Sequence, residues 1–171
     1  MISDTHDLLR PTAKLALANT GDAPFPFGLG FHPFFPRTAT TTLAFQAEAF
    51  WENDGTQLPI RRVAVPETWH REMLQARSNV TIDNVFTGWN GTATLADPQW
   101  PFTVEIAADR AAGFLVVYAP AGRDFIAVEP VTQMTDAFNR AERGEPGTGT
   151  RVLAAGAAFS CTMRIFVRGR S

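Results

Sequence analysis

The 171-residue sequence has little of what several protein classes require. It contains one cysteine, Cys161, which excludes an intrachain disulfide framework and favours a reducing compartment. No apolar run is long enough for a membrane-spanning helix, and the N-terminal MISDTHD has neither the basic start nor the apolar block of a signal peptide. We therefore expect a cytoplasmic protein with no membrane partner.

The sequence also has no marked excess of positive or negative charge. The chain has 15 Lys+Arg against 17 Asp+Glu, a net charge of -2, and its basic residues form no run. Proteins that bind polyanions usually concentrate positive charge on one face or in one segment. The sequence therefore predicts no nucleic-acid partner.

Motifs for metals, nucleotides and covalent catalysis are missing. The three histidines, His6, His32 and His70, are scattered, and there is no HExxH and no cysteine pair. Gly28-Leu29-Gly30 lacks the rest of a dinucleotide loop, and no GxxxxGK[ST] or GxSxG occurs. We predict no metal, no cofactor and no serine or cysteine nucleophile.

Apolar residues and turn residues are abundant instead. The chain is 45% hydrophobic with 14 Phe, enough for a core, and 12 Pro and 13 Gly divide it into short segments that alternate apolar and polar positions. The alternating or apolar segments are residues 15–17, 42–47, 102–106, 114–118, 125–128 and 159–167. They predict one all-β domain over residues 1–171, an antiparallel sandwich with a helical turn or two at 135–142 and an ambiguous segment at 66–74. The predicted core residues are Phe45, Val104, Ile106, Val117, Ile126, Cys161 and Ile165.

One glutamate stands at the end of an apolar segment. Residues 114–118 and 125–128 predict two strands joined by the turn at 119–122, and Glu129 follows directly, just before Pro130. Alternation puts Glu129 on one face with Phe125 and Ala127, and Pro130 is expected to end the ladder. The carboxylate is either a rim ion pair, for instance with Arg123, or part of a polar site.

Two further residues allow a structural and a functional interpretation. His32 lies within FPFGLGFHPFFP, where it is either a hydrogen-bonded core histidine or a group in a pocket. Asp83, in TIDNVF, is either a turn device or a sugar ligand, with Trp89 supplying a ring face. Each residue considered alone favours the structural interpretation.

The order of these segments resembles the aldose 1-epimerase (galactose mutarotase) family. GLGFHPFF resembles the family segment with a histidine general acid, IDNVF the segment with a sugar-binding aspartate, and VEPVTQMTDAFN the segment with a glutamate general base. WENDGTQLP resembles the connection between the first two segments. The resemblance covers almost the whole chain.

The resemblance implies an antiparallel β-supersandwich and a cofactor-free exchange of sugar anomers. Opening a pyranose needs a base for the C1 hydroxyl proton and an acid for the ring oxygen. The resemblance assigns the base to Glu129 and the acid to His32, and it assigns sugar contacts to Asp83, Phe34, Trp89 and Tyr118. The ligand would be a monosaccharide or a sugar phosphate.

The chain also departs from the family pattern. A sugar-binding arginine segment and a second histidine have no counterpart, the residues around Arg10 do not match that motif, and Val116 and Val117 occupy positions where a glutamine often precedes the tyrosine. The departures leave three alternatives: an N-terminally shortened or fragmentary member with weak activity, a site that another subunit completes, or a homologue that has lost catalysis and keeps a sugar-binding or structural role. Sheet edges uncovered in a shortened chain predict a homo-oligomer.

Two other functions stay open at this point. A non-catalytic carbohydrate-binding sandwich would bind sugar without changing the rate at which anomers equilibrate. A retaining glycoside hydrolase would use Asp83 and Glu129, with carboxyl groups about 5 Å apart.

Overall fold

The computed structural model describes residues 7–65 and 81–170, and the regular secondary structure within them is almost entirely antiparallel β strand. The predictions on His6, His70 and segment 66–74 lie outside the described residues. None of the described helices is long and apolar enough to cross a membrane.

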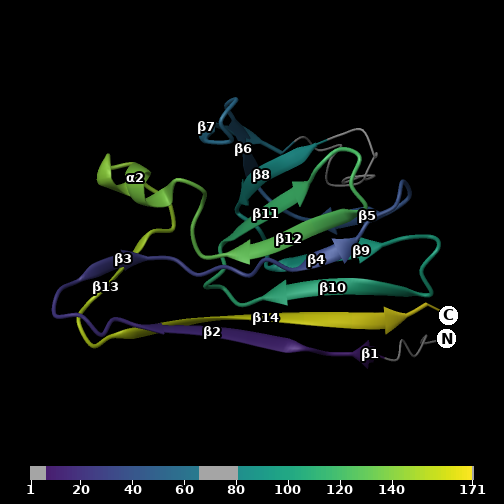
Figure 1. The fold of residues 1–171 in the computed structure, drawn as a ribbon, viewed down its shortest axis with the longest axis horizontal. Helices are drawn as coiled ribbons and strands as arrows, with labels where there is room; N and C mark the ends of the chain where they lie inside the picture. The colour runs from purple at the N-terminus through teal and green to yellow at the C-terminus, as the bar shows by residue number, and fades with distance from the viewer. Residues whose placement is uncertain (1–6, 66–80, 171) are drawn as a thin grey trace.

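The first sheet contains the long strands near the two ends of the described chain (Figure 1). Its strands, in spatial order, are β1 (Asp7–Leu9), β14 (Ala158–Gly169), β10 (Phe102–Ala108), β9 (Thr92–Ala96) and β5 (Thr42–Phe45), with β2 (Thr12–Ala18) also paired to β14. All pairs are antiparallel. The alternating segments 15–17, 102–106 and 159–167 thus form strands as predicted, and 42–47 does so up to Phe45, because period-two alternation suits a sheet with one covered face.

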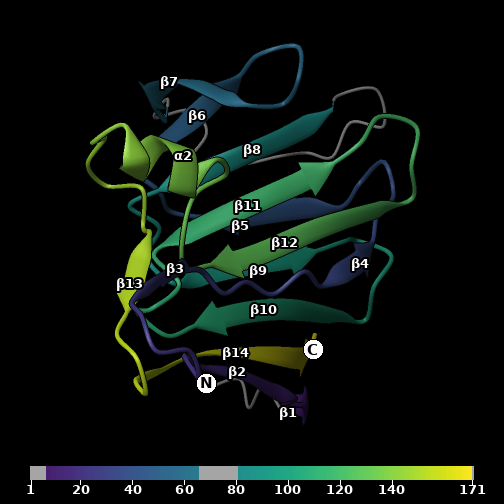
Figure 2. The ribbon, with the colours of Figure 1, turned by 60° about the vertical axis from the view of Figure 1, so that its left-hand side comes forward.

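The second sheet carries the candidate chemical residues. Its order is β4 (Phe34–Pro36), β12 (Phe125–Val131), β11 (Phe114–Ala119), β8 (Ile82–Thr87), β6 (Ala49–Asn53) and β7 (Pro59–Ala64). A separate pair, β3 (Phe25–Phe27) with β13 (Arg151–Leu153), extends to one side, and α2 (Ala137–Glu142) lies near β6 and β8 (Figure 2). The helical turn predicted at 135–142 is this helix.

The two large sheets enclose the main core. Its fully buried members come from both sheets and include Leu43, Leu95, Ile106, Cys161, Phe86, Leu115, Val117 and Ile126. Six of the seven predicted core residues are buried, and the seventh, Ile165, is half-buried and packs against the same cluster. The antiparallel sandwich predicted from alternation is confirmed.

The prediction that Pro130 ends the ladder is wrong. β12 continues to Val131, and Pro130 lies opposite Leu115 of β11. The Pro130 carbonyl accepts a hydrogen bond from the Phe31 N–H at 3.0 Å, on the side away from β11. A residue of an antiparallel pair directs its N–H and C=O to the same neighbour. The N–H that proline lacks would therefore face Phe31, and the β11 ladder loses nothing.

Leu115 offers a test of the core. It is 0% exposed between the sheets, so Leu115→Ala should lower the free energy of unfolding by about 3–5 kcal/mol, the cost of lost transfer energy plus a cavity. Leu58→Ala, at a side chain 45% exposed, should change it by no more than about 0.5 kcal/mol. Urea unfolding of both variants measures the difference, and equal losses would contradict the burial of Leu115.

Candidate active site on the second sheet

One face of the second sheet packs on the core, and the other carries the chemical side chains. In the register of β8, β11 and β12, Asp83 lies opposite Tyr118 and Tyr118 opposite Ala127. Glu129 is two residues further along β12, so alternation puts it on the same face. We call this surface the site face. Phe34 of β4 also belongs to it, because Phe34 pairs with Ala127.

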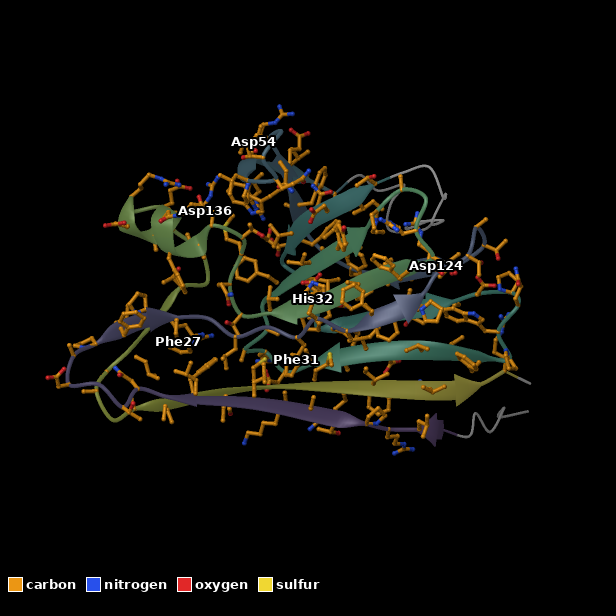
Figure 3. All side chains as sticks on the ribbon, viewed as in Figure 1. Phe27, Phe31, His32, Asp54, Asp124 and Asp136 are labelled. Carbon is orange, nitrogen blue, oxygen red and sulfur yellow. The ribbon has the colours of Figure 1, made fainter. Side chains whose placement is uncertain are left out.

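His32 joins the site face as the direct cross-strand neighbour of Glu129. Two observed pairs fix the register, Gly30 with Val131 and Phe34 with Ala127. His32 therefore lies opposite Glu129, although 97 positions separate them in the sequence. Phe31 points the other way and is buried in the core, and Figure 3 shows where both side chains lie.

The pair is held between two backbone hydrogen bonds. The Phe31 N–H donates to the Pro130 carbonyl at 3.0 Å, and the Val128 N–H donates to the Pro33 carbonyl at 3.3 Å. The residue between two such bonds forms a non-hydrogen-bonded pair with its partner, and in these pairs the Cα atoms and side chains approach most closely. The ladder itself thus brings the two side chains together.

The two side chains are in contact. His32 Nε2 lies 3.1 Å from Glu129 Oε1, and the histidine side chain is 54% exposed while the glutamate side chain is 10% exposed. The partner of Glu129 is therefore His32, whereas Arg123 lies exposed in the turn between β11 and β12. The rim ion pair with Arg123 is not the arrangement found.

The surroundings of Glu129 tune its acidity. Burial raises the pKa of Glu129 to about 7, the positive charge of His32 opposes this, and the carboxylate of Asp83 adds to it. Burial also raises the pKa of Asp83. A carboxyl group that titrates near neutral pH is suited to take up and return a proton. The influence of Asp83 on Glu129 shows that the two carboxyl groups share one electrostatic environment.

Aromatic rings line the edge of the site face. The rings of His32 and Phe34 are 4.7 Å apart, those of Phe34 and Phe125 5.4 Å, and those of Phe125 and Tyr118 6.2 Å. Phe34 is 57% exposed. Phe125 was not among the residues predicted for the site, although alternation already put it on the face of Glu129. Together the rings form an apolar wall beside the two carboxyl groups.

Trp89 does not join this group, and its predicted role as a sugar contact is corrected. It is 7% exposed within the main core, and its indole N–H donates to the Thr92 carbonyl at 2.8 Å. Alternation from Asp83 would have directed residue 89 to the site face. Gly88 interrupts the alternation with φ 67, a left-handed conformation that glycine adopts readily.

A second small cluster covers the far end of the site face. Val85 and Phe114 pack there with Met134 and Ala137, which belong to the segment after β12 and to α2. The Arg140 guanidinium of α2 stacks 4.8 Å from the centre of the Trp51 ring. Glu129 lies opposite Val116 at the border of this cluster, and Asp83 lies one strand pair further along the site face, opposite Tyr118.

The side chains of the site are better suited to proton transfer and ring stacking than to metal binding. Within residues 7–65 and 81–170, no three His, Cys, Asp or Glu side chains are grouped so that they could hold a metal ion. A contacting histidine and glutamate, the glutamate titrating near neutral pH, can instead exchange protons with a bound molecule.

Comparison with known proteins agrees with the sequence resemblance. The family described as aldose 1-epimerase matches residues 8–165. An uncharacterized protein, YphB, from Escherichia coli (strain K12) is 28% identical over an alignment 164 positions long, and the match covers 81% of this chain and 52% of YphB.

Solved structures share the fold. A protein of Escherichia coli K12 provisionally described as an aldose 1-epimerase superposes with a TM-score of 0.82 at 24% identity, over 94% of this chain and 57% of that one. A galactose mutarotase-like protein from Clostridium acetobutylicum gives a TM-score of 0.77 at 14% identity, over 93% and 52%. The chain thus spans little more than half the length of the relatives it matches.

Proposed function

Because the chain belongs to the aldose 1-epimerase family, we propose that it interconverts the α and β anomers of an aldose by general acid–base opening of the sugar ring. The observation that carries the proposal is the contact between His32 and Glu129 at 3.1 Å. An acid and a base in contact with each other can reach two oxygens bonded to one carbon atom, which is what anomer exchange needs.

The proposed reaction consists of two proton transfers and their reversal. The Glu129 carboxylate removes the proton from the C1 hydroxyl, His32 protonates the ring oxygen, and the bond between C1 and the ring oxygen breaks to give the open aldehyde. After rotation about the C1–C2 bond, His32 takes the proton back and Glu129 returns the other as the ring closes on the opposite face. Both residues regain their starting states, so no cofactor is required in this scheme.

The remaining residues of the site face suit a sugar. Asp83 would accept hydrogen bonds from hydroxyl groups, and the rings of Phe34, Phe125 and Tyr118 would contact the apolar face of a pyranose. The arginine and second histidine that the resemblance led us to expect match no segment of the sequence. We therefore propose a weak activity, because a slightly misplaced substrate can cost about a hundredfold in rate.

Polarimetry tests the proposed function. Fresh α-glucose, α-galactose and their phosphates are followed with and without the protein at neutral pH. We expect the optical rotation of at least one of these sugars to relax faster with the protein than without it. Relaxation at the buffer rate for the whole panel, with sugar binding detected by calorimetry, would favour a carbohydrate-binding module instead. Release of free sugar from aryl glycosides would favour the hydrolase, although the group that touches Glu129 is a histidine and not a second carboxylic acid.

Asp83→Asn should mainly weaken sugar binding. A hydrogen bond to a charged group contributes about 1.5–3 kcal/mol, so we expect KM to rise roughly tenfold or more while kcat changes less. The variant should also lower the pKa of Glu129, because the Asp83 charge helps to raise it. The acid limb of the rate profile then moves to lower pH. Asp124→Asn, at an exposed position in the β11–β12 turn, is the control, and a shift of the same size in both variants would contradict the role of Asp83.

A further inference from the structure

The segment that carries His32 is joined to β12 by an unusual hydrogen bond to a side-chain hydroxyl. At the last pair of this ladder, the Thr132 N–H donates to the Leu29 carbonyl at 2.8 Å. In a regular antiparallel pair the Leu29 N–H would donate back to the Thr132 carbonyl. It donates instead to the Thr132 hydroxyl, Oγ1, at 2.8 Å.

The Thr132 carbonyl is directed elsewhere. Its oxygen lies so close to Gly149 that a Cβ on that residue would come within 2.5 Å of it. The side chain of Thr132 therefore replaces its own carbonyl as the acceptor. Thr132 is 2% exposed, and its hydroxyl donates in turn to Gln133 Oε1 at 2.6 Å. Both hydrogen-bonding roles of the hydroxyl are in use.

Two glycines allow the segments to lie this close. A Cβ at Gly28 would come within 2.1 Å of the Gln133 side chain, and a Cβ at Gly30 within 2.8 Å of Val131 Cγ1. We call Thr132, Gln133 and the residues 28–30 that face them the clamp. Its hydrogen-bonded pair, Leu29 with Thr132, lies three positions from the catalytic pair on each strand. On that side of the pair, only the Phe31–Pro130 bond lies between His32 and the clamp.

We propose that Thr132 is a positioning residue of the site, whose hydroxyl holds the His32 segment in register so that His32 stays in contact with Glu129. The proposal rests on the proposed function for its kinetic consequence, but its structural consequence can be measured without any activity. Proline removes the back-donated bond at both neighbouring pairs, since neither Pro33 nor Pro130 has an N–H. Because two hydrogen bonds of this ladder are missing, the bond to the Thr132 hydroxyl makes up a larger share of the bonds that fix the register than one bond in a complete ladder would.

The charges around Glu129 provide the readout. Facing Glu129 are His32 from the β3–β4 connection and Asp83 from β8, and Tyr118 of β11 lies on the same face. The His32 charge lowers the pKa of Glu129 and the Asp83 charge raises it. If His32 moves away while Asp83 stays and Glu129 remains buried, Glu129 loses the charge that lowers its pKa, and we expect that pKa to rise.

The test is Thr132→Val, which keeps the shape and removes the hydroxyl. Labelled glutamate and NMR follow the titration of Glu129, and polarimetry follows the rate. We expect the pKa of Glu129 to move upward from about 7, and kcat to fall roughly tenfold to a hundredfold with KM changed less. Thr132→Ser keeps the hydroxyl and should restore the Glu129 titration toward that of the wild type.

Thr41 supplies a matched control. Its hydroxyl is also buried, accepts the Thr38 N–H at 2.8 Å and donates to Asp97 at 2.7 Å, and it precedes β5 in the first sheet. Thr41→Val removes the same two bonds elsewhere, so it should lower thermal stability and leave the Glu129 titration unchanged.

The Glu129 titrations of the Thr132 and Thr41 variants show whether Thr132 positions His32. An upward shift in Thr132→Val alone supports the positioning role, even if polarimetry shows no activity and the proposed function fails. An unchanged Glu129 titration in folded Thr132→Val, or the same shift in Thr41→Val, overturns it. If Thr132→Val does not fold, Gly30→Ala presses a methyl group against Val131 and should raise the pKa of Glu129 by the same route. No shift in that variant overturns the proposal as well.

Discussion

Glu129→Gln should remove all anomer exchange above the buffer rate. The amide keeps the size of the side chain but cannot take the C1 hydroxyl proton, and general base catalysis contributes roughly a hundredfold to ten-thousandfold. Since the proposed activity is weak, a loss of this size leaves nothing measurable. Polarimetry of wild type and variant side by side, with the best substrate of the sugar panel, provides the measurement.

The variant should fold at least as well as the wild type. The pKa of Glu129 is raised from an ordinary 4.5 to about 7 in the folded protein. The folded state therefore binds more protons than the unfolded state between these values, and the contribution of Glu129 to stability declines as pH rises through that window. Glu129→Gln should lack this decline. Glu105→Gln, on the first sheet beside Arg168, is the control for activity. Equal rates in wild type and folded Glu129→Gln would leave the sugar-binding module as the better interpretation.

His32→Ala should lower kcat by roughly a hundredfold or more, because the ring oxygen loses its proton donor. It should also change the pH dependence. The charge of His32 lowers the pKa of Glu129, so its loss should raise that pKa and move the acid limb of the rate profile to higher pH. The rate measured from pH 5 to 9 tests both effects.

Chemical rescue separates the loss of an acid from a loss of structure. The His32 side chain is 54% exposed, so free imidazole has access to the space that the alanine variant leaves. Added imidazole should restore part of the rate in His32→Ala and none in Glu129→Gln. A variant whose rate equals that of the wild type would refute the assignment of His32 as the acid.

The sequence alone predicted the all-β sandwich and most of its core, for a local reason. Strand alternation is a property of neighbouring residues, so Val104 and Ile106, or Val117 and Ile126, could be assigned to buried faces before any pairing was known. The same rule put Phe125 on the face of Glu129. The order of the motifs around His32, Asp83 and Glu129 indicated the family, which the comparison confirmed.

Strand alternation and the rule for proline failed in two places, one decided by a distant segment of the chain and one by an unusual backbone conformation. Pro130 was expected to end its strand, but its missing N–H would face Phe31 and not β11. Trp89 was expected on the site face, but the left-handed turn at Gly88 directs it into the core.

The chemistry of the site was decided by the tertiary structure. The family resemblance led us to expect His32 and Glu129 at one sugar ring, but the strand patterns alone predicted neither their pairing nor the pKa of the carboxyl group. One antiparallel ladder pairs His32 with Glu129 across 97 positions, and the burial of Glu129 is the main cause that raises the pKa of its carboxyl group to about 7. Residue types are written in the sequence, whereas register and desolvation depend on which distant strand lies alongside, and those two determine whether the pair can exchange protons at neutral pH.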